Sequence, residues 1–279
     1  MRWLEDVIFD GWWSTQAAIQ FSGGGQDAPS ITYGDLMRRS ASLATRLRDA
    51  VQIGGSPRVA VFTAGGPEHI VADLAGLMAG LVVVSVPIAE RHIWPDDLLD
   101  DTGVVIADAP GRRALSRFER STDRQGLYEV VPVSFDAPMV ALTPPALRGE
   151  QDDVCKVTFV DDRVPHRMVA LTGFALDSIV GALRRTTTPR RYSAAGDHQD
   201  RLVEQVWVYR TLAVQGTVVF PAAPQPPNLG LSAQTSGLRE FINNGPVQLV
   251  ADIFSHIVEG HTAIAALATD LAMRTSAVM

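Results

Sequence analysis

The chain has 279 residues, of which 46% are hydrophobic and 20% charged, and its formal net charge at pH 7 is −7. This composition excludes a largely disordered chain, and the length is sufficient for one large α/β domain or two lobes. An acidic chain without a basic stripe also argues against nucleic-acid binding. The most basic stretch contains Arg184, Arg185, Arg190 and Arg191. We interpret it as a solvated helix end, with a docking patch for an acidic carrier protein or a phosphate as the alternative.

The single cysteine, Cys155, allows no disulfide within the chain and fits a reducing cytoplasm. The first residues, MRWLEDVIFDGWW, carry acidic side chains early and no small-residue cleavage site, so we expect no signal peptide. The most apolar run, Leu74–Ile88, is too short to span a bilayer. The sequence therefore predicts a soluble, cytoplasmic protein without membrane contact.

The first strong helix signal is the capping-box spacing of Thr32 and Asp35, followed by apolar residues that face inward. No clear strand leads into the glycine-rich stretch SGGGQ, Ser22–Gln26, which is interpreted as a surface turn. Beyond this helix, strands and helices alternate. The expected strands are Arg58–Thr63, Leu81–Val86, Val104–Asp108, Leu127–Val133, Val154–Val160, Gly216–Phe220 and Val247–Val250. The expected helices are Glu68–Met78, Asp96–Asp101, Arg112–Arg120, one after Thr172 as N-cap, about 200–214, Leu238–Asn243 and a tail to Met273.

This alternation predicts an α/β fold of mainly parallel βαβ sheets flanked by helices. The strands are near-continuous apolar runs, as sheets covered on both faces require. A proline-rich connector, Pro138–Asp153, is the best boundary within the chain. We therefore expect a first lobe over residues 1–145 and a second over residues 146–279, which ends in the helical tail.

The stretch FVDDRVPHRMVALTG, Phe159–Gly173, lies between a strand pattern and a helix pattern. In α/β proteins such a junction often binds phosphate through glycines and hydroxyls. Between Phe159 and Leu171 this stretch has no Gly, Ser or Thr. It is a site that lost its chemistry, a site with different chemistry, or a loop.

Two segments carry a family resemblance. They are ITYGDLMRRSASLATRLRD, and RVAVFTAGGPEHIVADLAGLMAGLVVVSVPI. Together with DDLLDDTGVVIAD and QGTVVF, they resemble the N-terminal part of the adenylate-forming (ANL) superfamily, which contains acyl-CoA synthetases, fatty-acyl-AMP ligases and adenylation domains of peptide synthetases. The resemblance covers about residues 31–220. It implies the fold of the N-terminal ANL subdomains, and a truncated member of that superfamily.

The resemblance also implies where the phosphate loop of such enzymes would lie. Their loop is rich in Gly, Ser and Thr, whose backbone N–H groups and hydroxyls hold phosphate, and a Lys neutralises charge. Here the matching segment is VDDRVPHR, with His166 where Lys is expected and Arg167 where Gly is expected. Asp161 and Asp162 bring the wrong charge to a polyphosphate. The resemblance therefore predicts a degenerate phosphate loop and no acyl-adenylate formation by this chain alone. We also expect no bound cofactor.

Asp161, Asp162 and His166 are the candidate catalytic residues, because a His beside carboxylates can exchange protons near neutral pH. Arg163, Arg167, Thr172 and His198 are the residues expected to contact a bound ligand. The alternative is a loop whose carboxylates form salt bridges with Arg163 and Arg167. No metal site is expected, because the six histidines show no ligand spacing and His256 and His261 are five residues apart.

Three functions remain open from the sequence. The first is a non-ligase relative that binds an acyl, aryl or carrier-tethered intermediate, or a protein partner, in a bacterial acyl or secondary-metabolite biosynthesis pathway. The second is an enzyme that reuses the cleft for cyclisation, dehydration or hydrolysis. The third is one half of a split ligase. Apolar surface left by a missing half predicts a homodimer or a tight partner complex.

Overall fold

The computed structural model describes residues 1–22, 30–54, 56–88, 98–122, 128–134, 139, 143–147, 151–159, 168–185, 191–194 and 202–221. All of them belong to the first of two compact units, Met1–Pro224. The helices described are α1 Arg2–Gly11, α2 Tyr33–Gly54, α3 Pro67–Ala79, α4 Ala109–Thr122, α5 Gly173–Arg184 and α6 Leu202–Ala213. The strands described are β1 Ala17–Ser22, β2 Ser30–Thr32, β3 Arg58–Phe62, β4 Val82–Ser85, β5 Thr102–Ala107, β6 Glu129–Pro132, β7 Val154–Phe159, β8 Met168–Thr172, β9 Arg191–Ser193 and β10 Thr217–Pro221.

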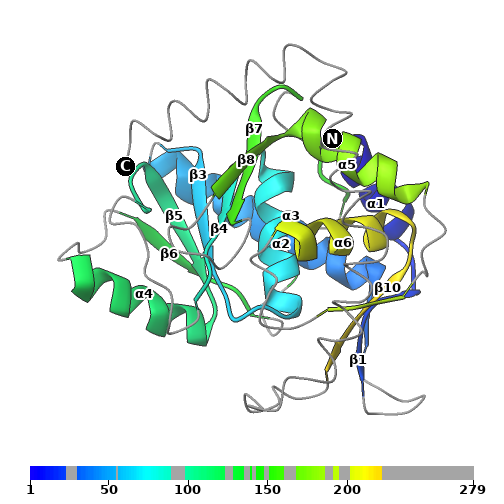
Figure 1. Cartoon of the computed structure of the whole chain (residues 1–279), viewed down its shortest axis with the longest axis horizontal. Coiled ribbons are helices and arrows are strands. Elements are labelled where there is room, and N and C mark those ends of the chain that lie inside the picture. The colour runs from blue at the N-terminus through cyan, green and yellow to red at the C-terminus, as the bar shows by residue number, and fades with distance from the viewer. Residues whose placement is uncertain are drawn as a thin grey trace, which may run out of the picture. The chain divides into compact units, whose positions relative to one another are not determined.

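The strands form two sheets (Figure 1). The larger sheet has six strands in the order β6-β5-β3-β4-β7-β8, and the smaller has four in the order β2-β1-β10-β9. Neighbouring strands are parallel except for β1 with β2 and β7 with β8. The predicted fold class, mainly parallel α/β sheets flanked by helices, is therefore confirmed.

Helices cover both faces of the larger sheet, which explains why its central strands consist mostly of apolar residues. On one face, α3 approaches so closely that a side chain on Gly76 would meet Val83. On the other face, Ala60 and Phe62 of β3 join a cluster with Phe118 of α4. Alternate residues of a strand point to opposite faces. Figure 1 shows α3 and α4 on either side of the strands.

Gly111 allows α4 to begin directly against the end of β3. A Cβ atom at this position would lie 1.6 Å from the carbonyl oxygen of Phe62. Only glycine fits such a close backbone approach, and its position fixes where the first turn of α4 meets the carboxyl edge of the sheet.

Several local predictions are confirmed. The Thr32 hydroxyl oxygen accepts a hydrogen bond from the Asp35 backbone N–H at 3.1 Å, as the capping box requires. Pro67 occupies the first turn of α3, and Thr172 is the N-cap of α5. The apolar residues of α2 that were expected inward are buried: Leu36, Leu43, Ala44 and Leu47.

Three local expectations are wrong. The SGGGQ stretch was expected to have no strand before it, but strand β1 leads into it. This strand forms by pairing with β10, which lies near the end of the described chain. Such a distant partner leaves no signal in the local sequence. Residues 98–101 form a turn rather than the end of a helix, and Asp101 adopts φ 57°, which a helix does not allow. Met168–Thr172 is not loop but strand β8, held antiparallel on β7.

The division into lobes at residues 145 and 146 stays a prediction. Strands from both sides of this position take part in both sheets. The helices and strand expected after residue 237 lie outside the described residues. Within the described part of the chain, no helix is long and apolar enough to cross a membrane.

Candidate functional site

The predicted site lies at the carboxyl edge of the larger sheet. Strands β3, β4, β5, β6 and β7 are parallel, so their carboxyl ends share one edge. Strand β7 reaches this edge at Phe159, and the chain returns through β8 from Met168. The segment between these two residues therefore begins where open α/β sheets bind ligands.

Most of the predicted site residues lie outside the described residues. They are Asp161, Asp162, Arg163, His166, Arg167 and His198. Their roles stay predictions, and the hairpin formed by β7 and β8 gives only the position of the segment that holds the first five.

Of the predicted site residues, only Thr172 lies among the residues that the structure describes. Its hydroxyl oxygen accepts a hydrogen bond from the Ala175 backbone N–H at 3.1 Å, and its backbone is extended as an N-cap requires. This geometry accounts for the residue as a helix cap. A role for Thr172 in ligand binding stays a prediction.

Asp108 organises the edge beside the predicted site. One of its carboxylate oxygens accepts a hydrogen bond from the Ala64 backbone N–H at 2.8 Å, and the other accepts one from Gly111 N–H at 2.6 Å. The carboxylate thus ties the turn after β3 to the start of α4. The Ala64 N–H, which could otherwise bind an anion at this turn, is used internally.

Glu68 adds a second carboxyl group near Asp108. Burial raises the pKa of Glu68, and the negative charge of Asp108 raises it further, although a hydrogen bond from its own backbone N–H opposes this shift. Two acidic side chains therefore stand where a phosphate-binding edge would present N–H donors and cations. A carboxylate at this turn repels an anionic ligand placed beside it.

A buried polar cluster lies beneath the edge, between α3, β4, β7 and α6. Lys156 donates hydrogen bonds to the Asp73 carboxylate and, at 2.9 Å, to the Ser85 hydroxyl. Tyr209 donates its hydroxyl to the other oxygen of Asp73. The Lys156 and Asp73 side chains are only 1% and 3% exposed. We refer to Asp73, Ser85, Lys156 and Tyr209 as the buried polar cluster.

The register of the sheet explains how the buried polar cluster forms. Lys156 lies opposite Val83 in the parallel pair of β4 and β7, and Val83 faces α3 at Gly76. The lysine therefore points to the α3 side, where Asp73 lies one turn before Gly76. Tyr209 arrives from α6, which packs against the smaller sheet, so the cluster joins elements of both sheets.

Burial dominates the electrostatics of the buried polar cluster. It lowers the pKa of Lys156, while the Asp73 charge and hydrogen bond oppose this effect. Burial raises the pKa of Tyr209 well above its usual value, and the Asp73 charge raises it further. A tyrosine that keeps its proton remains a hydrogen-bond donor to Asp73. The cluster is therefore a neutral or paired assembly with no side chain open to a substrate.

His69 lies in the same interior. Its Nδ1 is 2.7 Å from the Thr63 hydroxyl, and its Nε2 is buried without a hydrogen-bond partner among the described residues. Burial lowers the pKa of His69 to about 4, with the Asp73 charge opposing and the Lys156 charge reinforcing the shift. The imidazole is therefore neutral at physiological pH, and its burial separates it from any solvent-borne ligand.

Cys155 is not a nucleophile in this environment. Burial raises its pKa to about 11, and its thiol points at the Leu171 carbonyl oxygen, 3.5 Å away. Nucleophilic cysteines need the opposite shift. Among the described residues, no group of three or more His, Cys, Asp or Glu is placed to hold a metal ion.

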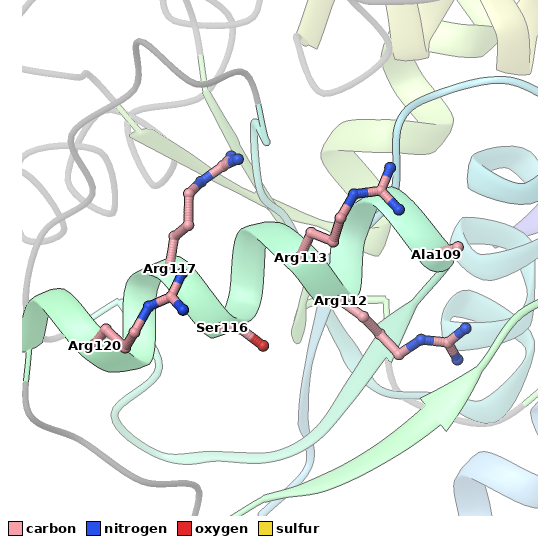
Figure 2. A pocket seen from close by; sticks show the side chains of 6 residues that line it. All are labelled: Ala109, Arg112, Arg113, Ser116, Arg117 and Arg120. Atoms are coloured by element: carbon pink, nitrogen blue, oxygen red, sulfur yellow. The ribbon is translucent and has the colours of Figure 1, made fainter.

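A separate surface feature lies on α4, where an open depression of about 500 Å³ is lined by Ala109, Arg112, Arg113, Ser116, Arg117 and Arg120 (Figure 2). Sequence reasoning considered only the arginines near residues 184–191 and missed this set. The signal was present as four arginines within nine residues of a helix. The buried polar cluster was also missed, although a lysine inside VCKVTF and an aspartate inside HIVADLAGLMAG were visible in the sequence.

The fold and its carboxyl edge define the class of protein: a mainly parallel α/β protein built like the N-terminal subdomains of adenylate-forming enzymes. The comparisons agree. The family model described as "AMP-binding enzyme" matches residues 13–91. Residues 13–91 are thus similar to part of that family. A search of curated proteins found no significant match.

Solved structures of this superfamily share the fold. The nonribosomal peptide synthetase FmoA3 in its AMPPNP-bound form is 20% identical, with a TM-score of 0.61, over 87% of this chain and 24% of that one. A luciferase-like enzyme from the nonluminescent Zophobas morio mealworm is 15% identical, with a TM-score of 0.61, over 80% and 54%. The amide bond synthetase McbA from Marinactinospora thermotolerans is 18% identical, with a TM-score of 0.58, over 86% and 46%. This chain therefore covers from about a quarter to about half of the lengths of these proteins.

Proposed function

We propose that this chain is a non-ligase relative of the adenylate-forming enzymes, which binds an acyl, aryl or carrier-tethered intermediate, or a protein partner, in a bacterial biosynthetic pathway. The observation that carries the proposal is the segment VDDRVPHR between β7 and β8. It follows the carboxyl end of β7 and contains no Gly, Ser or Thr to hold phosphate. Peptide synthetases and amide bond synthetases among the similar structures support the biosynthetic setting.

The chemistry of the edge supports the loss of ATP binding. In the sequence, Asp161 and Asp162 come two and three residues after the end of β7, and Asp108 and Glu68 stand at the same edge of the sheet. Asp108 also uses the Ala64 N–H. Each additional carboxylate raises the cost of placing a polyphosphate there unless a metal ion intervenes. An uncharged acyl or aryl group meets no such repulsion.

Two measurements test the proposal. Calorimetric titration of the full chain with ATP and Mg²⁺ should give no binding at micromolar concentrations, whereas micromolar affinity would refute the non-ligase assignment. Thermal-shift titration with an acyl-pantetheine thioester and with the uncharged aryl compound benzamide should show stabilisation by at least one of them. If neither compound shifts the melting temperature, the proposal that the chain binds small acyl or aryl ligands is wrong.

A variant with Asp161→Ser and Asp162→Gly sharpens the ATP measurement. It removes both carboxylates and restores a hydroxyl and a glycine, so any weak ATP affinity should increase. The matched control replaces Asp10 and Asp152 with the same residue types, since both aspartates are exposed and lie outside the segment. An equal change in the control would show an effect of net charge alone.

The alternative of an enzyme with a reused cleft has His166 as its acid–base group. Replacement of His166 by Ala should leave ligand-induced stabilisation intact if the chain is a binding protein. Loss of product formation in the producing organism, with ligand binding unchanged, would instead favour catalysis.

A further inference from the structure

The exposed arginines of α4 form a cationic strip that the proposed function does not use. Arg112, Arg113 and Arg120 are exposed, and Arg117 is half-buried. Ser116 lies between them on the lining of the same depression. From Arg112 to Arg120 the strip runs eight residues along the helix, or about 12 Å.

The three exposed arginines of the strip, Arg112, Arg113 and Arg120, form no ion pair with any of the described residues. Arg117 is held differently, since it donates to the Ile88 carbonyl oxygen at 3.1 Å. The acidic residue of the helix, Glu119, accepts the Tyr128 hydroxyl at 2.7 Å. The three exposed guanidinium groups therefore carry the charge of the strip.

The charge of α4 is opposite to that of the rest of the chain. Residues 109–122 contain four Arg and one Glu, which gives a net charge of +3. With a chain total of −7, the remaining residues carry −10. Such a confined positive strip does not arise from a generally basic surface, and it produces a local attraction for anions that fades within about 8–10 Å at physiological salt.

The shape of the strip favours an extended anionic surface over a single phosphate. Figure 2 shows the side chains of Arg113 and Arg117 extending to one side of α4 and that of Arg112 to the other. Guanidinium groups that spread apart cannot all reach one phosphate group, but they can each pair with a separate carboxylate. The depression is also open rather than enclosed, which suits a protein surface.

We propose that the arginine strip of α4 docks a carboxylate-rich protein segment, such as an acidic helix of a partner protein. Nucleic acid is disfavoured because a long polyanion extends beyond the strip and meets the remaining net charge of −10. A partner with a small acidic footprint gains the attraction without that repulsion. The proposal is independent of whether the segment between β7 and β8 binds a ligand.

The test uses fluorescence anisotropy of a labelled peptide of about twelve glutamates, long enough to span the strip, titrated with the full chain. The wild-type chain should bind, and affinity should fall steeply as salt is raised. The variant R112E/R113E/R120E should bind at least about tenfold more weakly, since three charge pairs become repulsive. The control R2E/R46E/R185E changes net charge equally at exposed arginines elsewhere and should keep at least half of the affinity.

Three outcomes of the binding measurements would overturn the proposal. The first is failure of the wild-type chain to bind the peptide, and the second is equal weakening in both triple variants. The third is tighter binding of a labelled single-stranded oligonucleotide of matched length than of the peptide. Sedimentation velocity adds a further decision: a concentration-dependent dimer abolished only by R112E/R113E/R120E would assign the strip to a second copy of this chain and overturn the separate partner. Circular dichroism of both variants confirms that the fold is retained.

Discussion

Removal of the charge at Lys156 tests the buried polar cluster most directly. In Lys156→Met, a side chain of similar length leaves Asp73 buried without its cation, while Tyr209 still donates to the carboxylate. Breaking one partner of a buried ion pair costs about 3–5 kcal/mol. Asp73→Asn, which leaves the lysine uncompensated, should cost a similar amount. Either loss is a large part of the about 5–15 kcal/mol that stabilises a typical domain.

The double variant separates an ion pair from simple loss of packing. With Lys156→Met and Asp73→Asn together, no buried charge remains, and the amide oxygen introduced at position 73 can still accept a hydrogen bond from Tyr209. The double variant should still lose about 1–3 kcal/mol of stability, because the Ser85 hydroxyl and the new amide are left without all of their hydrogen bonds. The double variant should therefore be more stable than either single variant.

Urea unfolding followed by tryptophan fluorescence measures these free energies, because Trp3 packs against Tyr209 with ring centroids 4.9 Å apart. A coupling energy of at least about 3 kcal/mol is expected from the cycle. Arg46→Met, at an exposed position of α2, is the matched control and should change stability by less than about 0.5 kcal/mol. Additive single effects, or a cost below about 1 kcal/mol for Lys156→Met, would refute the reasoning.

Three further predictions follow from individual residues. Burial lowers the pKa of His69 in the folded state to about 4, against a usual 6.5. Between these two pH values the unfolded chain binds more protons than the folded chain, so the free energy of unfolding falls as the pH falls, by up to about 3 kcal/mol. Urea unfolding at pH 7 and pH 4 measures this loss, which should be absent in His69→Gln. Gly111→Ala forces a Cβ atom against the carbonyl oxygen of Phe62 and should destabilise by at least about 3 kcal/mol in the same assay, whereas Gly181→Ala, which meets nothing within 4 Å, should be neutral or stabilising. Thr172→Ala should cost about 1 kcal/mol of stability and Thr172→Ser almost none; a selective loss of ligand binding without loss of stability would contradict its assignment as a cap.

The sequence predicts the larger sheet well because its strands carry the signal locally. Val59, Ala60 and Val61 are buried on both faces, and such strands are continuous apolar runs that need no knowledge of their partners. Helix α2 is equally clear, since its cap at Thr32 and its apolar period are both local. These elements are predictable from a window of a few residues.

The smaller sheet was harder to predict because its pairing is distant in the chain. Strand β1 pairs with β10, and Ile19 lies beside Val218. Residues 17–22 alternate only weakly between apolar and polar side chains, so nothing in the local pattern identifies them as a strand. Strand β8 was missed for a related reason: its pairing with β7 follows from a hairpin whose connecting sequence has no glycine signal.

The candidate site shows the same limit in chemical terms. A sequence can indicate that Gly, Ser and Thr are absent from the segment after β7, but it cannot indicate which distant carboxylates share that edge. Asp108 and Glu68 are 40 residues apart in the chain (108 − 68), yet the charge of one raises the pKa of the other. The closeness of Asp108 and Glu68 is therefore a property of the folded sheet. Carboxyl groups outside the segment would add to the repulsion of a polyphosphate that is expected from Asp161 and Asp162. Restoring the loop sequence alone should therefore not restore full ATP affinity.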